Sequence, residues 1–252
     1  AAMSPAPEID EMTIAQALAP TPLVQCLGVP LRAPACSEFV LEGRVTHRTT
    51  AEGPFVDLTE TYDIVRQQAI IEIDRITHRR DAIYQALLPG GLEHKLLMGL
   101  PREPTIFRAV SQVCRCLAVH VTPGGASWLH AVVQIEKESP DDGRRAALAA
   151  FRGHSSLKHV VVVDADVNPY DMAQVEWAIA TRFQADSGLT VLRDQPSSSL
   201  DPSATQVPGQ KARTTKMALD ATIPWDTHGG PSDPRGFTRV PMEPLSIQEY
   251  ID

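Results

Sequence analysis

The sequence predicts a mixed α/β (α+β) fold, with a β-rich first part and an α/β second part that meet near residue 115. Residues 38–45 and 68–75 alternate apolar and polar side chains, which is typical of strands with one solvated face. Residues 159–164 (HVVVVD) form a continuous β-branched run, typical of a parallel strand buried on both faces. Residues 171–183 follow with apolar side chains at helical spacing, so strands come first and then alternate with helices.

The first part is expected to be rich in strands. The spacing predicts a short helix over 14–19 and strands over 38–45 and 68–75, with 82–88 as a third candidate strand. Ile106, Val110, Val113 and Leu117 recur at helical spacing, which predicts a helix over 104–117.

The second part alternates strands and helices. A strand is expected over 130–136, and a helix over 141–151 has acidic residues in its first turn, where they suit the helix dipole. Residues 194–213 and 224–244 are rich in proline and predict irregular segments. The expected division is therefore a flexible tail (1–12), a first domain (13–115) and an α/β domain (116–252) with an irregular C-terminal segment.

Composition excludes several classes of protein. The 252 residues carry 23 Lys and Arg against 31 Asp and Glu, a net charge of −8, which argues against a nucleic-acid partner. No apolar run approaches the roughly 18 residues that a membrane-spanning helix needs. The first residues show no signal-peptide pattern, and four cysteines do not make a disulfide framework. We therefore expect a reducing, cytoplasmic location.

Three groups of residues have a chemical interpretation beside an ordinary structural one. Glu38 and Glu42 lie four apart in a strand, so both face one side, where they could hold a hard cation or simply meet solvent. Glu93 follows a Pro-Gly-Gly turn, which could present it to a site or place it in the first turn of a helix. The basic cluster that includes Lys211 and Lys216 could bind a phosphate or be solvated.

Other patterns are weaker. Asp164, Asp166 and Asn168 resemble the start of a calcium loop, but Pro169 occupies the position of its glycine and no glutamate closes the loop. Cys114 and Cys116, two apart in the expected helix, are interpreted as packing residues. The sequence contains no HExxH, G-x-S-x-G, Walker or GxGxxG motif.

Five separated segments together resemble the UbiD family of decarboxylases, which use prenylated FMN. They lie in the family's order within residues 13–224: EFVLEG (38–43), AEGPF (51–55), ITHRRDAIYQALLPG (76–90), LKHVVVVDADVNPYDMAQVEWAIATRFQAD (157–186) and KMALDAT (216–222). Family members are usually about twice this length. The resemblance therefore implies the second half of such an enzyme: the later part of a split β-barrel that binds flavin (13–115), followed by the α/β domain (116–252).

The resemblance also assigns roles to three residues. Glu42, rather than Glu38, is similar to the glutamate that binds the divalent metal beside the flavin phosphate. Lys216 is similar to the lysine that holds that phosphate. Glu93 is the best match for the acid/base, although the family more often has a pair of acidic residues there. The implied cofactors are prenylated FMN and Mn²⁺ or Mg²⁺, with K⁺ as a further candidate.

The other half of the cofactor site is missing from the sequence. The family's Asn and His metal ligands and its substrate-binding Arg lie upstream of the matched region, and Asn168 is the only asparagine here. We therefore expect a partner polypeptide that supplies this half, or a fragment of a longer enzyme. The expected reaction is the loss or reversible addition of CO₂ on an α,β-unsaturated or aromatic carboxylic acid, in an oligomer. The alternatives are a non-catalytic assembly subunit and a flavin-binding module, although the latter lacks a dinucleotide fingerprint.

Overall fold

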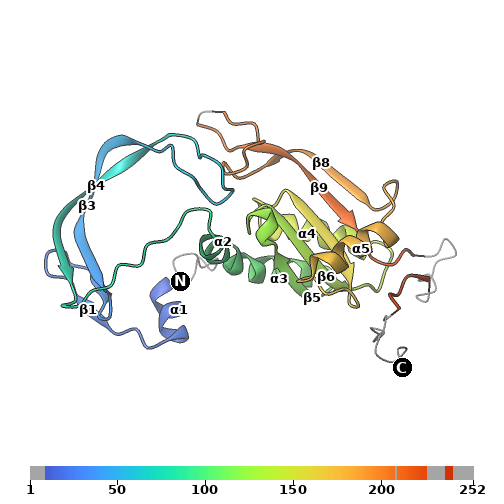
Figure 1. The fold of residues 1–252 in the computed structure, drawn as a ribbon, viewed down its shortest axis with the longest axis horizontal. Helices are drawn as coiled ribbons and strands as arrows, with labels where there is room; N and C mark the ends of the chain where they lie inside the picture. The colour runs from blue at the N-terminus through green and yellow to red at the C-terminus, as the bar shows by residue number, and fades with distance from the viewer. Residues whose placement is uncertain (1–8, 208, 226–235, 241–252) are drawn as a thin grey trace, which may run out of the picture.

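The structure of the chain is a computed structural model that describes residues 9–207, 209–225 and 236–240. It is elongated, with a long curved hairpin toward one end and a compact α/β unit toward the other (Figure 1). The mixed α/β fold class is confirmed. The expected tail is only partly described, because residues 1–8 lie outside the described residues and a helix already begins at Glu11.

The N-terminal segment contains a helix and a small ribbon. Helix α1 spans Glu11–Leu18, and the side chain of Asp10 caps it by accepting a hydrogen bond from the backbone N–H of Met12. Strands β1 (Leu23–Gln25) and β2 (Arg32–Pro34) pair antiparallel, and the loop between them lies against the next strand.

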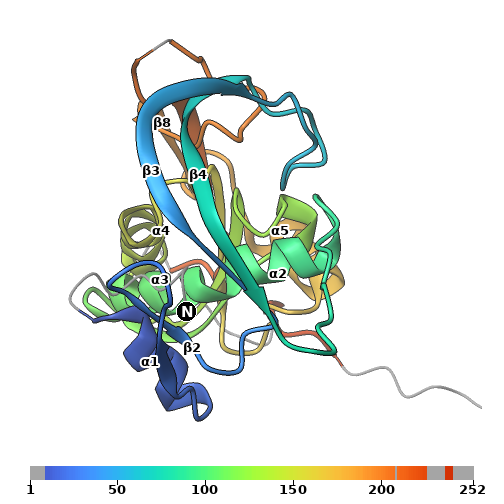
Figure 2. The ribbon, with the colours of Figure 1, turned by 90° about the vertical axis from the view of Figure 1, so that its left-hand side faces the viewer.

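The hairpin is formed by two long antiparallel strands, β3 (Phe39–Glu52) and β4 (Arg66–His78). Both expected strands of the first part are therefore confirmed, and both extend further than the alternation predicted. The pairing is interrupted by irregularities at Glu42/Gly43 and Val45/Thr49. Among the described strands, β3 and β4 pair only with each other; Figure 1 shows them as a curved ribbon set apart from the five-stranded sheet, and Figure 2 shows the two strands running side by side.

The expected strand over 82–88 is wrong, because this segment has no regular secondary structure and pairs with no described strand. Helix α2 (Leu92–Gly99), a 3₁₀ turn η1 (Leu100–Arg102) and helix α3 (Glu103–Ser111) follow. The helix expected over 104–117 is therefore right only in its first part. The N–H groups of Val113 and Cys114 close the helix on the carbonyl of Val110, and a strand then begins at Arg115.

The α/β unit is built on a five-stranded sheet in the order β5-β6-β7-β9-β8. The three central strands are parallel and the two edge strands are antiparallel to their neighbours. The strands are β5 (Arg115–Val121), β6 (His130–Glu136), β7 (His159–Asp164), β8 (Leu189–Pro196) and β9 (Arg213–Asp220). A 3₁₀ turn η2 (Pro123–Gly125) joins β5 to β6. β6 and β7 were expected, whereas β8 and β9 were not; they flank the segment predicted to be irregular (194–213) and overlap it only at residues 194–196 and 213.

Helices cover both faces of this sheet. Helix α4 (Asp142–Gly153) packs with α3 on one face, where Ile106, Val110 and the alanines of α4 meet the valines of the central strands. Helix α5 (Met172–Arg182) covers the other face through Val175 and Ala178. The expected helices over 141–151 and 171–183 are thus confirmed, and their small residues allow close packing on the sheet.

A third, smaller apolar cluster joins the loop after β3 to the α/β unit. Leu58 is fully buried there against Ala126 and Trp128. This contact fixes the end of the hairpin beside the sheet. Within the described residues, no helix is both long enough and apolar enough to cross a membrane.

Candidate functional site

Glu42 lies on β3 and its side chain is buried. Its carboxylate accepts hydrogen bonds from the backbone N–H groups of Leu27 (3.0 Å) and Val29 (3.2 Å), and also from that of Gly28. The hydrogen bond from Leu27 is the main reason that the pKa of Glu42 lies below its usual value, and burial opposes this effect. The structure therefore keeps Glu42 ionised and uses it to hold the loop between β1 and β2.

Glu38, the less favoured alternative, has a different environment. It precedes β3, and its carboxylate accepts hydrogen bonds from the Arg79 guanidinium (3.0 Å) and the Ile83 backbone N–H (3.1 Å). These contacts tie the extended segment after β4 back to the start of β3. They also explain why that segment is ordered without belonging to a sheet.

Glu93 lies in the first turn of α2 and is exposed. Its Oε1 accepts a hydrogen bond of 2.6 Å from Nε2 of Gln85. The backbone N–H of Gly90, in the preceding turn, donates to Nδ1 of His94 (3.2 Å). The turn therefore does present a carboxylate outward, and the described residues leave it open to solvent.

Lys216 lies at the centre of β9 and is 3% exposed. Its Nζ donates to the carbonyl of Ser155 (2.6 Å) and lies 5.2 Å from the centroid of the Phe151 ring. Burial, with a smaller contribution from the charge of Lys211, lowers the pKa of Lys216 to about 8. No carboxylate within the described residues pairs with it. Such a buried cation without a counter-ion fits an anionic group such as a flavin phosphate.

The structure holds these three residues in separate surroundings. Within the described residues, no hydrogen bond or ion pair joins Glu42, Glu93 and Lys216, and no three His, Cys, Asp or Glu side chains gather as a metal-binding group. Mg²⁺ needs six oxygen ligands in a near-octahedral arrangement, and Glu42, whose oxygens already accept three backbone N–H groups, cannot complete such a site alone. The described residues do not, by themselves, fit the implied metal.

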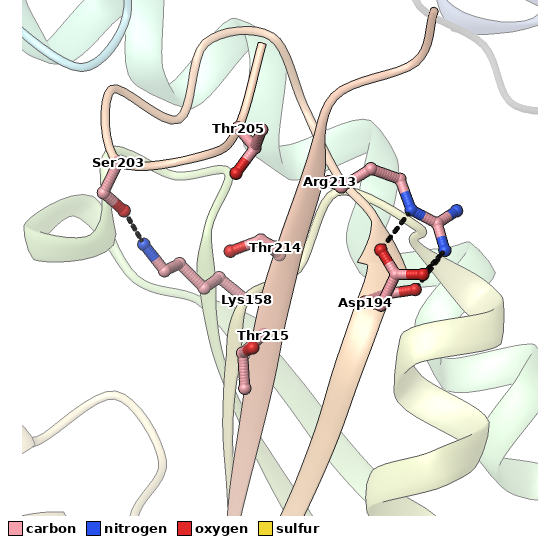
Figure 3. A pocket seen from close by; sticks show the side chains of 7 residues that line it. All are labelled: Lys158, Asp194, Ser203, Thr205, Arg213, Thr214 and Thr215. Carbon is pink, nitrogen blue, oxygen red and sulfur yellow. Dashed lines mark hydrogen bonds and ion pairs between the residues drawn. The ribbon is translucent and has the colours of Figure 1, made fainter. Parts of the chain in front are cut away.

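Among the cavities beside the loop between β8 and β9, two are large. One, of about 490 Å³, is polar and is lined by Lys158, Arg213 and several hydroxyl groups (Figure 3). Both of its cations are already paired, Lys158 with Asp201 (3.1 Å) and Arg213 with Asp194 (2.8 Å). The other, of about 890 Å³, lies between residues 64–67 at the start of β4 and residues 197–212. The wall formed by residues 197–212 belongs to the proline-rich segment that the sequence predicts to be irregular (194–213).

The remaining patterns in the sequence have structural explanations. Arg182, whose side chain is fully buried, pairs with Asp164 (2.9 Å) and Asp166 (2.6 Å), so these carboxylates hold α5 to the end of β7. Burial raises the pKa of the Cys116 thiol to about 12 and that of Cys114 to about 11, so neither is a reactive thiolate.

Two family models match the chain and together cover most of it. The Rift-related domain of 3-octaprenyl-4-hydroxybenzoate carboxy-lyase (UbiD) matches residues 1–92, and the C-terminal domain of the same carboxy-lyase matches residues 95–221.

Curated relatives are decarboxylases. The chain is 48% identical over 188 residues to an anhydromevalonate phosphate decarboxylase of Methanocaldococcus jannaschii, covering 74% of this chain and 44% of the relative. It is 50% identical over 187 residues to the enzyme of the same name from Methanosarcina mazei, covering 74% of this chain and 43% of that relative. A gallate decarboxylase of Lactiplantibacillus plantarum is 33% identical over 223 residues, or 81% of this chain and 46% of the relative. The chain thus spans about half the length of these relatives.

Solved structures show the same arrangement. The UbiD-class enzyme HmfF from Pelotomaculum thermopropionicum in complex with FMN superposes with a TM-score of 0.87 at 35% identity, covering 99% of this chain and 56% of that one. The 3,4-dihydroxybenzoic acid decarboxylase of Klebsiella pneumoniae superposes with a TM-score of 0.83 at 28% identity, covering 99% of this chain and 55% of that one.

Proposed function

Because this chain belongs to the UbiD family, we propose that it forms the C-terminal half of a decarboxylase that acts on a carboxylic acid with prenylated FMN. The other half would come from a partner polypeptide or from the remainder of a longer chain. The half-length match to relatives supports this proposal.

The open hairpin is the observation that carries the proposal. Large apolar side chains of β3 and β4 face solvent, among them Val45 (70% exposed), Ile71 (59%) and Ile76 (61%). Exposed apolar surface costs about 25 cal/mol per Å², so a hairpin of this length is expected to be covered in the complete protein. A second half of a split barrel would pair with the free strand edges and bury these side chains.

The proposed reaction requires three tasks of the protein. When bound, prenylated FMN supplies the electron sink for the carbanion left by CO₂ loss. In this proposal Lys216 holds the flavin phosphate through its buried ammonium group, and Glu93 returns a proton to the carbon that lost CO₂. Glu42 would contribute one oxygen ligand to Mn²⁺ or Mg²⁺ only if the missing half brings the others, and a K⁺ ion has the same requirement. Glu93 is exposed in the described chain, so in this proposal it acts as the proton donor only after the missing half has covered it.

The favoured substrate class is an α,β-unsaturated acid that carries a phosphate group. The relatives named anhydromevalonate phosphate decarboxylase are 44–50% identical, whereas the gallate decarboxylase, which acts on an aromatic acid, is 33% identical. We therefore place the unsaturated phosphate ester ahead of an aromatic acid. The oligomeric state and the cytoplasmic location stay predictions.

Native mass spectrometry of the protein purified from its source cells tests the proposal. We expect the chain bound to a second polypeptide, or contained within a longer one, together with a mass that matches prenylated FMN. The same preparation should release CO₂ from anhydromevalonate phosphate. A flavin-free chain without a partner and without this activity would contradict the proposal and favour a non-catalytic assembly subunit.

A further inference from the structure

The segment that leads from β4 to α2 has no regular secondary structure, but contacts with the start of β3 hold it in place. The Glu38 carboxylate accepts hydrogen bonds from the Arg79 guanidinium (3.0 Å) and the Ile83 backbone N–H (3.1 Å). The ring of Tyr84 meets the aromatic ring of the first residue of β3 edge-on, with centroids 6.3 Å apart. These contacts fix the backbone immediately before Gln85.

Gln85 connects this segment to the carboxylate of Glu93. Its Nε2 donates to Oε1 of Glu93 at 2.6 Å, across eight residues of the chain. On the other side of the contact, Glu93 lies in the first turn of α2. The hydrogen bond from the Gly90 backbone N–H to Nδ1 of His94 (3.2 Å) holds the turn that precedes it. Both partners are therefore attached to backbone that other contacts hold.

The hydrogen bond between Gln85 and Glu93 orients a side chain more than it stabilises the fold. Both side chains are exposed, so water competes for the same donor and acceptor, and the bond adds little to stability. It does select one direction for the Glu93 carboxyl group, which rotation about the side-chain bonds would otherwise leave free. Orientation is the property that a proton donor needs, because transfer requires the donor oxygen within hydrogen-bond reach of the reacting atom.

The donor that contacts Glu93 is neutral. Oε1 can accept the amide N–H both as an oxygen of the carboxylate and as the carbonyl oxygen of the protonated acid. A cationic donor would instead favour the ionised form, which has no proton to give. Lys95, the nearby cation on α2, pairs with Glu60, and within the described residues Glu93 forms no ion pair. The contact is thus compatible with both protonation states of Glu93.

We propose that Gln85 is a positioning residue for Glu93. The amide occupies Oε1, so Oε2 is the oxygen that carries the proton toward the substrate. In the transfer the Oε2–H bond breaks and its electron pair stays on the carboxylate, while a C–H bond forms at the carbon that lost CO₂; water then restores the proton. Glu38 supports this arrangement by holding the segment that carries Gln85. The inference rests on the proposed function, which assigns proton return to Glu93.

Gln85→Met in the complete enzyme tests this role, because methionine keeps the length of the side chain and removes the amide. We expect kcat to fall about tenfold, while KM, flavin content and melting temperature stay unchanged. Gln85→His should recover most of the turnover, since its Nε2 reaches about as far and can donate. The matched control is Gln195→Met, which removes an amide that donates to the Arg193 carbonyl on β8 (2.9 Å) and should leave kcat unchanged. A normal kcat in Gln85→Met would overturn the proposal.

A double variant distinguishes positioning from a general structural role. If Gln85 acts through Glu93, Gln85→Met should cause no further loss of turnover in an enzyme that already carries Glu93→Gln. Equal losses in both backgrounds would overturn the proposal. Failure of the proposed function gives a different result: a parent enzyme that releases no CO₂ contradicts the role of Glu93 and, with it, that of Gln85. An active parent with a fully active Gln85→Met variant contradicts the role of Gln85 alone.

Discussion

At the scale of single residues, Glu42 and Lys216 are two buried charges that the chain stabilises to different degrees. Glu42 already satisfies three backbone N–H groups and keeps a lowered pKa, so it is ionised without any metal. Lys216 is the opposite case, because burial lowers its pKa and only a carbonyl oxygen and an aromatic ring offset that cost. Glu42 is thus stable in the chain as described, whereas Lys216 lacks a counter-ion.

The role of Glu93 gives the first prediction. Glu93→Gln keeps the hydrogen-bonding capacity toward Gln85 but cannot transfer a proton, so turnover should fall by at least 10²-fold while flavin stays bound. Steady-state CO₂ release and the flavin absorbance of the complete enzyme measure the two effects separately. Glu60→Gln, which changes an exposed carboxylate paired with Lys95, is the control. Normal turnover in Glu93→Gln would show that another group is the acid.

His130 gives a prediction about stability and pH. Burial, aided by the charges of His159 and His120, lowers the pKa of His130 to about 4 from its ordinary value near 6.5. As pH falls from 6.5 to 4, the unfolded chain takes up this proton first, so acid favours unfolding in that window. The shift corresponds to roughly 3 kcal/mol in the free energy of unfolding. Between pH 7 and pH 4, chemical denaturation should show a smaller loss in the free energy of unfolding for His130→Gln than for the parent chain. Equal losses would show that His130 does not cause the destabilisation by acid.

At the scale of elements, the close approach of α3 and α4 depends on a glycine. A Cβ at Gly153, the last residue of α4, would lie 2.7 Å from Cα of Ile106 and 2.8 Å from the carbonyl oxygen of Thr105. Alanine is favoured over glycine in helices by about 1 kcal/mol, but overpacking costs typically about 1–3 kcal/mol. The cost of overpacking should exceed the gain in helix propensity, because the atoms that a Cβ would meet belong to the backbone.

Gly153→Ala should therefore lower the melting temperature by several degrees. Differential scanning calorimetry measures this change. The matched control is Gly124→Ala, where a Cβ would meet nothing within 4 Å and the melting temperature should hardly change. If both variants melt like the parent chain, the contact between α3 and α4 is looser than the structure indicates.

The elements also show what the sequence could and could not predict. β7 was predictable because its valines are buried on both faces, which leaves an unmistakable apolar run. β9 was missed because Lys216 and two threonines interrupt its pattern, and that lysine is explained by tertiary contacts with the Ser155 carbonyl and the Phe151 ring. The candidate strand over 82–88 failed for the opposite reason, since its apolar residues have no described strand to pair with. The three site residues came from a family resemblance, whereas the contacts of Trp128 with Arg102 and His154 join distant segments that no local pattern records.

At the scale of the whole molecule, a compact α/β unit carries a hairpin that the rest of the described chain leaves open. Helices cover the apolar core on each face of the five-stranded sheet. β3 and β4, in contrast, have free edges and exposed apolar side chains within the described chain. The α/β unit therefore has the buried core of a stable fold, and the exposed apolar side chains of the hairpin are typical of a protein interface. These two behaviours can be separated by mutation.

Charged residues on the hairpin should abolish assembly without unfolding the α/β unit. Val45 and Ile71 lie directly opposite each other across the two strands, so Val45→Glu with Ile71→Glu places two like charges on the exposed apolar face. We expect the double variant to lose its complex with the missing half in native mass spectrometry, while the melting transition of the α/β unit stays unchanged. Arg44→Gln with Glu72→Gln alters the neighbouring paired residues without a net charge change and should still assemble. If the double glutamate variant assembled normally, the missing half would bind elsewhere, and the open hairpin would not be the incomplete side of a barrel.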